Sequence, residues 1–138
     1  MQDLLACNPD QIEPIQMVKY EPGQLFGLHH DLGTLAEDGE VLLPRRNYFA
    51  PTKRRLMTAL VYLDSLPGYY DGGETSFPQC EYLLQHEAPT NFSIKPMRGT
   101  LVLWSNITEE GLPEGKTVHE AKSACFRKLA LNIWICEK

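Results

Sequence analysis

Three residues of this sequence, His29, Asp31 and His119, are of types that could together bind one metal ion. In a β-strand successive side chains point to opposite faces, so a strand through His29 and Asp31 would present both on one face. Two imidazoles and one carboxylate are the donor set of mononuclear non-haem Fe(II) sites, which keep other coordination positions open. His119 is the obvious third ligand. Taken alone, a His-x-Asp tripeptide is more often a pair of surface polar residues.

A lysine nine positions after His119 makes the metal interpretation stronger. From Lys128 onward the sequence alternates, and Lys128 falls on the same strand face as Ala130, Asn132 and Trp134. An unpaired lysine is costly to bury, and a carboxylate partner removes that cost through a charge-assisted hydrogen bond. We therefore expect Lys128, rather than its outward-facing neighbour Arg127, to bind an anionic group inside a barrel.

With several further segments, these residues resemble the 2-oxoglutarate/Fe(II)-dependent dioxygenases, and within them the catalytic domain of prolyl 4-hydroxylases. The similarity runs from about residue 16 to residue 134. The segments that carry it are Tyr20-Glu21-Pro22-Gly23-Gln24, His29-His30-Asp31, Gly72-Gly73-Glu74-Thr75-Ser76-Phe77-Pro78, Arg98-Gly99-Thr100, His119, and Lys128 through Trp134. Each motif is weak alone, and the combination is specific.

The resemblance implies that His29, Asp31 and His119 bind Fe(II) and that Lys128 pairs with the distal carboxylate of 2-oxoglutarate. The implied reaction consumes 2-oxoglutarate and O2, releases succinate and CO2, and hydroxylates a C–H bond, with ascorbate as an expected further requirement. Related halogenating enzymes lack the carboxylate at the position of Asp31, so its presence favours hydroxylation.

Three more residues are implied to lie near 2-oxoglutarate. The family places a hydrogen-bonding tyrosine at the position of Tyr20, a hydroxyl-bearing or apolar side chain at Thr75, and an aromatic ring at Tyr62. The alternative for Tyr20 is simple packing, because a tyrosine at the end of a strand often serves only to fill space.

The resemblance favours a proline in a peptide or protein as the substrate. Lysyl residues, free amino acids and alkylated nucleic acid are alternatives. Two further alternatives keep the barrel without this chemistry. One is a non-catalytic binding module, and the other is a cupin-like barrel with another divalent metal, which would leave Lys128 without a partner.

The elements that must position these residues are mostly strands. Alternating or apolar patterns predict strands over 15–20, 25–31, 55–64, 100–106 and from 128 onward, and a short one after Gly73. We expect a mainly β fold, a double-stranded β-helix (jelly roll) of about seven strands with a few supporting helical segments, one of them within residues 1–13. The strand at 55–64 should be covered on both faces, and the apolar run 101–104 predicts another buried strand. Residues 80–93 are predicted to be a loop, with His86 exposed.

The segment between residues 32 and 53 loses periodicity. Long irregular segments in compact domains are often lids or binding loops, so it could cover a peptide groove; a plain surface insertion is equally compatible with the sequence.

The composition limits the number of domains, the partners and the location that the sequence allows. The 138 residues fit one domain, here 1–138, with 43% hydrophobic and 22% charged residues. Thirteen basic against eighteen acidic residues argue against a nucleic-acid partner. No apolar run is long enough to span a membrane. The amino terminus lacks a secretory signal, which predicts a cytoplasmic protein if the chain is complete; an excised domain could come from the endoplasmic reticulum lumen.

Cysteine spacing gives no sign of a metal site. The four cysteines are Cys7, Cys80, Cys125 and Cys136, without a Cys-x-x-Cys pair. We expect free or buried thiols, with a disulfide as the alternative.

Overall fold

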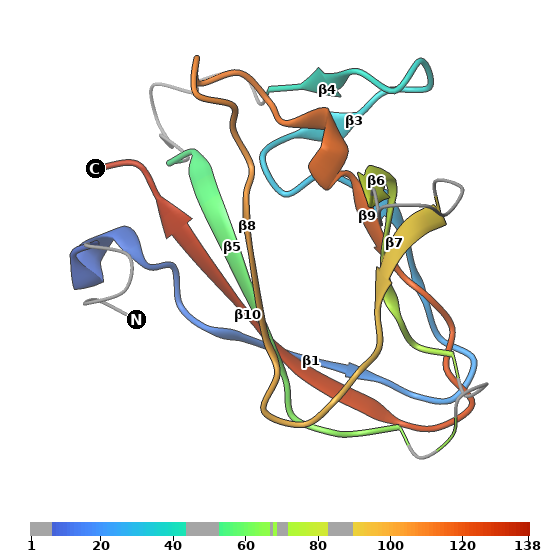
Figure 1. The fold of residues 1–138 in the computed structure, drawn as a ribbon. Helices are drawn as coiled ribbons and strands as arrows, with labels where there is room; N and C mark the ends of the chain where they lie inside the picture. Colours follow the sequence, from blue (N-terminus) through green and yellow to red (C-terminus); the bar gives the residue numbers. More distant parts are fainter. Residues whose placement is uncertain (1–6, 44–52, 67, 69–71, 83–89) are drawn as a thin grey trace.

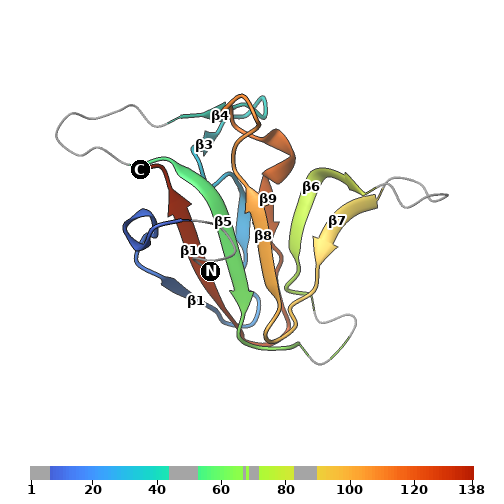
Figure 2. The ribbon, with the colours of Figure 1, turned by 60° about the vertical axis from the view of Figure 1, so that its left-hand side comes forward.

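Two four-stranded antiparallel sheets face each other in the computed structural model, which describes residues 7–43, 53–66, 68, 72–82 and 90–138 (Figures 1 and 2). The first sheet has the order β1-β10-β5-β8 and the second the order β2-β9-β6-β7. The strands of the first are β1 (Gln16–Tyr20), β10 (Lys128–Cys136), β5 (Arg55–Tyr62) and β8 (Leu101–Ser105). Those of the second are β2 (Phe26–His29), β9 (His119–Ala121), β6 (Thr75–Tyr82) and β7 (Thr90–Ile94).

Strands remote in the sequence are neighbours in both sheets, which is the arrangement of the predicted double-stranded β-helix. β1 pairs with the last strand, β10, and β2 pairs with β9. This topology brings the segment around His29 next to the segment around His119, about ninety positions later. The fold therefore supplies the convergence that the proposed ligand set requires.

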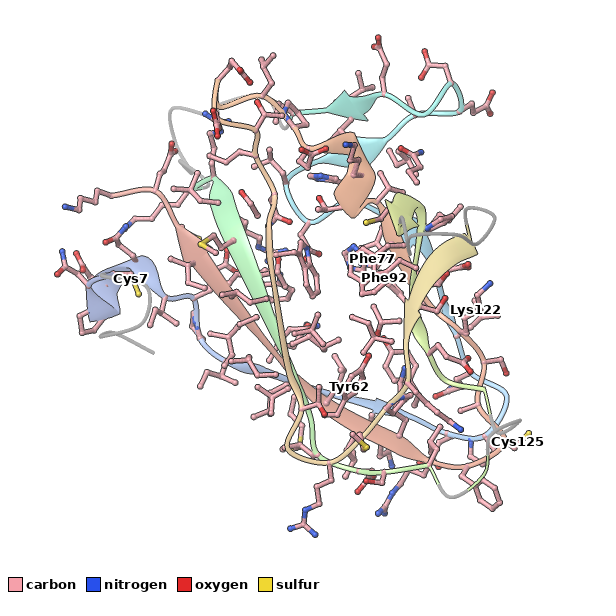
Figure 3. All side chains as sticks on the ribbon, in the orientation of Figure 1. Cys7, Tyr62, Phe77, Phe92, Lys122 and Cys125 are labelled. Carbon is pink, nitrogen blue, oxygen red and sulfur yellow. The ribbon has the colours of Figure 1, made fainter. Side chains whose placement is uncertain are left out.

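The inner faces of the sheets meet through aromatic side chains. Trp134, Thr58 and Trp104 form one row across the first sheet, because Thr58 pairs with Trp134 on one side and Trp104 on the other. The ring of Phe77, on β6, lies edge-on to Trp104 with centroids 5.3 Å apart. Figure 3 shows Phe77 beside Phe92 on the second sheet and Tyr62 reaching inward from the first.

The outer face of the first sheet is only partly covered. Ala59, Ile133 and Ile135 are buried there with Cys7. On edge strand β8, however, Leu101 and Leu103 are 43% and 36% exposed. The prediction of a buried strand at 101–104 was therefore wrong. An apolar run alone does not distinguish a central strand from an edge strand, and β8 is an edge strand.

The prediction of a loop over 80–93 was also wrong for the residues that the structure describes. β6 continues to Tyr82, and β7 begins at Thr90. The two strands pair from Thr75 with Ile94 to Tyr82 with Thr90, across a bulge. Strand pairing supplies backbone hydrogen bonds even where the side-chain pattern is irregular, which explains the difference. His86 lies outside the described residues.

Helical structure is limited to two 3₁₀ turns among the described residues, η1 (Pro9–Gln11) and η2 (Gly115–Thr117). The Gln11 side chain caps η1 by accepting from the Asn8 N–H at 3.1 Å. Residues 1–6 of the expected helical segment lie outside the described part of the chain. The segment 32–53 contains a small hairpin, β3 (Thr34–Leu35) with β4 (Val41–Leu42), and its residues 44–52 are likewise not described.

All four cysteines are free thiols. Cys7 and Cys125 lie at opposite sides of the molecule (Figure 3). In the described part of the chain, no helix has the length and apolar character needed to cross a membrane.

Candidate functional site

A cavity of about 490 Å³ opens between the two sheets. Both sheets contribute to its wall, and all seven residues that the sequence nominated lie on it. They are His29, Asp31 and His119, together with Lys128, Tyr20, Thr75 and Tyr62. One cavity thus holds the candidate metal ligands and the candidate co-substrate residues.

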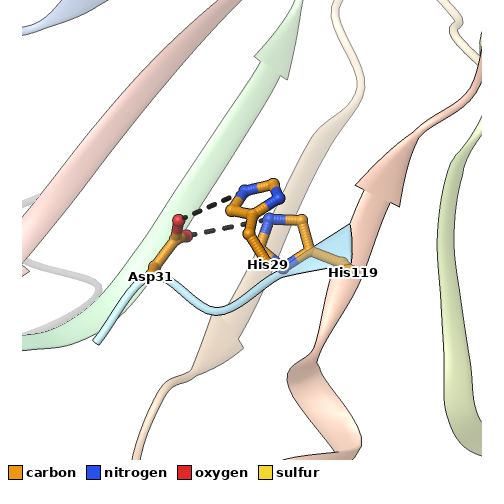
Figure 4. A group of neighbouring side chains, drawn as sticks. All are labelled: His29, Asp31 and His119. Carbon is orange, nitrogen blue, oxygen red and sulfur yellow. Dashed lines mark ion pairs between the residues drawn. The ribbon is translucent and has the colours of Figure 1, made fainter. Parts of the chain in front are cut away.

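The three candidate ligands lie close enough to share one ion (Figure 4). His29 Nε2 is 3.7 Å from Asp31 Oδ1, and His119 Nε2 is 3.9 Å from Asp31 Oδ2. His29 ends β2 and pairs directly with His119, which begins β9. Asp31 lies just beyond the strand end, so the prediction of a strand through Asp31 was wrong by two residues. A bend there still turns its carboxylate toward the imidazoles.

Backbone carbonyls set which nitrogen of each imidazole is free. His29 Nδ1 is 2.8 Å from the Gly27 carbonyl, and His119 Nδ1 is 2.9 Å from the Thr117 carbonyl. A carbonyl oxygen only accepts, so each Nδ1 carries the proton and each Nε2 keeps its lone pair. Both Nε2 atoms face Asp31, so the donors are in the form that binds a divalent metal.

Burial also favours the metal-binding form of His119. Its side chain is only 8% exposed, and desolvation lowers its pKa below the usual histidine value. A neutral imidazole is the ligand form, so little proton competition remains at neutral pH. The Asp31 side chain is 6% exposed, and a bound divalent cation would compensate for burying its charge.

Lys128 lies deeper between the sheets and is 2% exposed. Its Nζ donates to the Gly73 carbonyl at 2.9 Å and lies 4.5 Å from the centroid of the Tyr20 ring. Gly73 has a φ of 77°, and a Cβ there would come within 2.7 Å of Leu66, so glycine is required for this approach. No ion pair joins Lys128 to a carboxylate of the described residues.

Keeping Lys128 protonated at this buried position therefore costs free energy of folding. Burial lowers its pKa to about 8. An unpaired cation with several donors, inside a cavity that also contains a metal-type cluster, is suited to an anionic ligand.

Tyr62, on β5 of the first sheet, and Thr75, on β6 of the second sheet, form a hydrogen-bonded pair across the cavity. The Tyr62 hydroxyl donates to Thr75 Oγ1 at 2.6 Å, and burial raises the Tyr62 pKa to about 12. Both side chains are almost fully buried, at 1% and 3% exposure. Tyr62 is therefore a neutral donor at physiological pH, fixed in orientation by Thr75.

Several wall residues were not nominated from sequence. Asn132 and Trp134 share the face of Lys128, so the alternation that identified Lys128 could have included them. Arg55 lies over the Trp134 ring at 3.6 Å and forms an ion pair with Glu13.

Phe26 packs against the His29 ring with centroids 4.2 Å apart. A bulge between Phe26 and His29 places both side chains on the cavity side, and no pattern in the sequence predicts such a bulge.

A double-stranded β-helix that carries a His-Asp-His cluster in the cavity between its sheets is typical of mononuclear non-haem metal proteins. Residues 15–136 match the model of the 2OG-Fe(II) oxygenase superfamily. The chain therefore belongs to this superfamily, whose metal is Fe(II) and whose co-substrate is 2-oxoglutarate.

Individual relatives are prolyl hydroxylases. The chain is 29% identical over 132 residues to the human transmembrane prolyl 4-hydroxylase, covering 78% of this chain and 26% of that protein. It is 26% identical to the chicken prolyl 4-hydroxylase subunit alpha-1, covering all of this chain and 22% of that protein. The chain thus spans about a quarter of the length of these relatives.

Among solved structures, the chain is similar to the viral collagen prolyl hydroxylase of Paramecium bursaria Chlorella virus-1 in its 2OG complex. The TM-score is 0.67 at 27% identity, covering 92% of this chain and 60% of that one. A Pseudomonas putida prolyl-4-hydroxylase, with a TM-score of 0.56 at 21% identity, shares the fold.

Proposed function

We propose that residues 1–138 form a catalytic domain that hydroxylates a peptidyl proline with Fe(II), 2-oxoglutarate and O2, releasing succinate and CO2. The observation that carries this proposal is the placement of the cluster His29–Asp31–His119 and the unpaired Lys128 in one cavity. A metal-only barrel explains the cluster but not the buried lysine. A dicarboxylate co-substrate explains both.

Each residue has a role that follows from its position. His29, Asp31 and His119 hold Fe(II), which when bound supplies the redox chemistry that couples 2-oxoglutarate and O2 to hydroxylation. Lys128 binds the distal carboxylate of 2-oxoglutarate by a charge-assisted hydrogen bond. Tyr20, on the same sheet as Lys128, would donate its hydroxyl hydrogen to that carboxylate, while the Tyr62 hydroxyl, which donates to Thr75, holds the Thr75 side chain in the cavity. These roles restrict 2-oxoglutarate to one orientation, with its keto acid end toward the cluster.

The substrate is assigned from the relatives and from the cavity mouth. The similar proteins named above are all prolyl 4-hydroxylases or collagen prolyl hydroxylases by name. The exposed side of the metal cluster carries the ring of Phe26, which is 52% exposed and lines the cavity. An apolar surface of this kind fits a pyrrolidine ring better than a charged lysyl side chain.

The experiment that tests the substrate compares peptides that differ only at one residue. The domain, with Fe(II), 2-oxoglutarate and ascorbate, is incubated with a proline-rich peptide, its proline-to-alanine counterpart and a lysine-rich peptide, and products are mapped by tandem mass spectrometry. We expect one added oxygen atom on proline in the first peptide alone. Oxygen on lysine, or succinate release stimulated equally by all three peptides, would contradict the assignment.

The affinity for 2-oxoglutarate should fall at alkaline pH. The pKa of Lys128 in the free protein is about 8, so the lysine is charged below this pH and loses its charge above it. Because the charged form binds the distal carboxylate, the dissociation constant should stay level below pH ~8 and then rise, approaching tenfold per pH unit. Titrations of the metal-loaded protein check this.

Pyruvate provides the control, since it has the keto acid end of 2-oxoglutarate without the distal carboxylate. Both ligands share the keto acid end, so pH effects on the metal cancel in the ratio of the dissociation constants of 2-oxoglutarate and pyruvate. The pH dependence that remains in this ratio reports on Lys128. A ratio independent of pH from 7 to 9.5 would show that Lys128 does not bind the co-substrate.

A further inference from the structure

The carboxylate of Asp31 is held from the opposite sheet by a buried hydroxyl group. Thr58, in the middle of β5, is 1% exposed, and its Oγ1 donates to Asp31 Oδ2 at 2.6 Å. The hydroxyl thereby engages one of the two oxygens of a side chain that also faces His29 and His119. Asp31 lies beyond the end of its strand, so it needs a partner of this kind to keep one orientation.

Asn106 in turn fixes the direction of that hydrogen bond. Its Nδ2 donates to the Arg55 carbonyl at 3.1 Å and to Thr58 Oγ1 at 2.9 Å. The Arg55 carbonyl only accepts, so the amide nitrogen of Asn106 must be the atom that faces it. Thr58 Oγ1 therefore accepts from Asn106, and its own hydrogen is left for Asp31 Oδ2.

The backbone makes this chain of hydrogen bonds rigid. Asn106 is 0% exposed and follows β8, which pairs with β5, and its backbone N–H donates to the Leu56 carbonyl at 2.8 Å. Thr58 lies in the row between Trp134 and Trp104. Thr58 thus belongs to a central strand of the first sheet and Asn106 directly follows its edge strand, while Asp31 belongs to the loop after β2.

We propose that Thr58 and Asn106 are positioning residues for the metal centre, which orient the Asp31 carboxylate so that it binds the metal through one oxygen. The inference rests on the proposed function, because it assigns the residues that support its metal ligand. A carboxylate with one oxygen held by Thr58 is hindered from chelating the metal with both. Chelation with both oxygens would occupy a position that 2-oxoglutarate or O2 requires.

The same contacts exclude a different use of Asn106. Asn106-Ile107-Thr108 matches the glycosylation acceptor pattern. Its amide nitrogen is buried and donates both hydrogens within the fold, so the folded protein does not present it for modification.

The test measures metal affinity without turnover. Co(II) is titrated into the metal-free protein, and binding is followed by quenching of tryptophan fluorescence. The Trp104 ring centroid lies 4.9 Å from that of His119, and Trp134 also lines the cavity. We expect Thr58→Val to weaken Co(II) binding by about 10- to 100-fold, as removal of a partner that orients a ligand typically does. Thr58→Ser keeps the hydroxyl and should bind Co(II) within about threefold of the parent.

Ser76→Ala is the matched control for a lost buried hydroxyl group. Ser76 is 2% exposed, accepts a hydrogen bond from Ser93 Oγ at 3.1 Å, and lies on the opposite face of β6 from the cavity-lining Thr75. Its loss should lower the melting temperature without changing Co(II) affinity. Folded Thr58→Val protein that binds Co(II) as tightly as the parent would overturn the positioning role. A parent protein that binds no Co(II) would instead overturn the metal site itself.

Discussion

Replacing Asp31 by alanine is expected to reduce iron-dependent turnover of 2-oxoglutarate to background, a loss on the order of 10³-fold or more. The variant keeps two imidazoles but loses the only carboxylate of the cluster among the described residues. Both the charge that balances a divalent cation and the third protein ligand disappear. Succinate release with Fe(II), 2-oxoglutarate and O2 measures the effect directly.

Asp38→Ala is the control for this change. Asp38 accepts a hydrogen bond from the Glu40 N–H in the exposed turn between β3 and β4, so its removal alters the charge of the protein equally and leaves the cavity intact. It should retain parental succinate release. Asp31→Ala protein that releases succinate at the parental rate would refute the metal-ligand assignment.

Replacing Lys128 by methionine should weaken the binding of 2-oxoglutarate and, at the same time, stabilise the folded protein. Loss of the buried cation removes the partner of the distal carboxylate, which costs about 2–5 kcal/mol of binding, or roughly 30- to several thousand-fold in the dissociation constant of 2-oxoglutarate. The free energy of unfolding, in contrast, should rise. Burial lowers the Lys128 pKa to about 8, so holding the charge at neutral pH destabilises the folded state.

The sign of the stability change follows from this shift. The folded protein binds its Lys128 proton less tightly than the unfolded chain, so the cost is present below pH ~8 and disappears as the pH approaches the ordinary lysine value of about 10.4. At neutral pH, Lys128→Met should therefore raise the free energy of unfolding by about 1–2 kcal/mol, after the loss of the Gly73 hydrogen bond is subtracted. Denaturant melts measure this gain.

Arg127→Met is the matched control, since it removes a neighbouring cation that is 58% exposed and lies 3.9 Å from Asp64. It should change neither 2-oxoglutarate affinity nor stability appreciably. A Lys128→Met variant that still binds 2-oxoglutarate with parental affinity would leave the buried lysine without the role assigned to it.

Local patterns predicted the parts of the site that lie on regular strands. Alternation from Lys128 to Trp134 correctly placed Lys128 on the inner face and Arg127 outside, because period-2 geometry depends only on neighbouring residues. The strand before His29 was predicted for the same reason. Its end was placed two residues late, because strand pairing stops at His29 and a bend follows.

What the sequence could not provide are contacts between remote segments. The chain Asn106–Thr58–Asp31 joins three parts of the sequence whose proximity follows only from the sheet order. The exposure of Leu101 likewise depends on β8 being an edge strand, which no local pattern encodes. The strand residues at 80–82 and 90–93 were missed because the pairing of β6 with β7, rather than propensity, makes these segments strands.

The most direct test of the site is binding of Fe(II) and 2-oxoglutarate in the absence of O2. A keto acid that chelates Fe(II) in the cavity gives a weak visible charge-transfer band, and we expect this band to saturate with 2-oxoglutarate in the parent protein and to require far higher concentrations in Lys128→Met. A folded parent protein that binds Fe(II) but never develops the band would contradict the assignment of this cavity to 2-oxoglutarate.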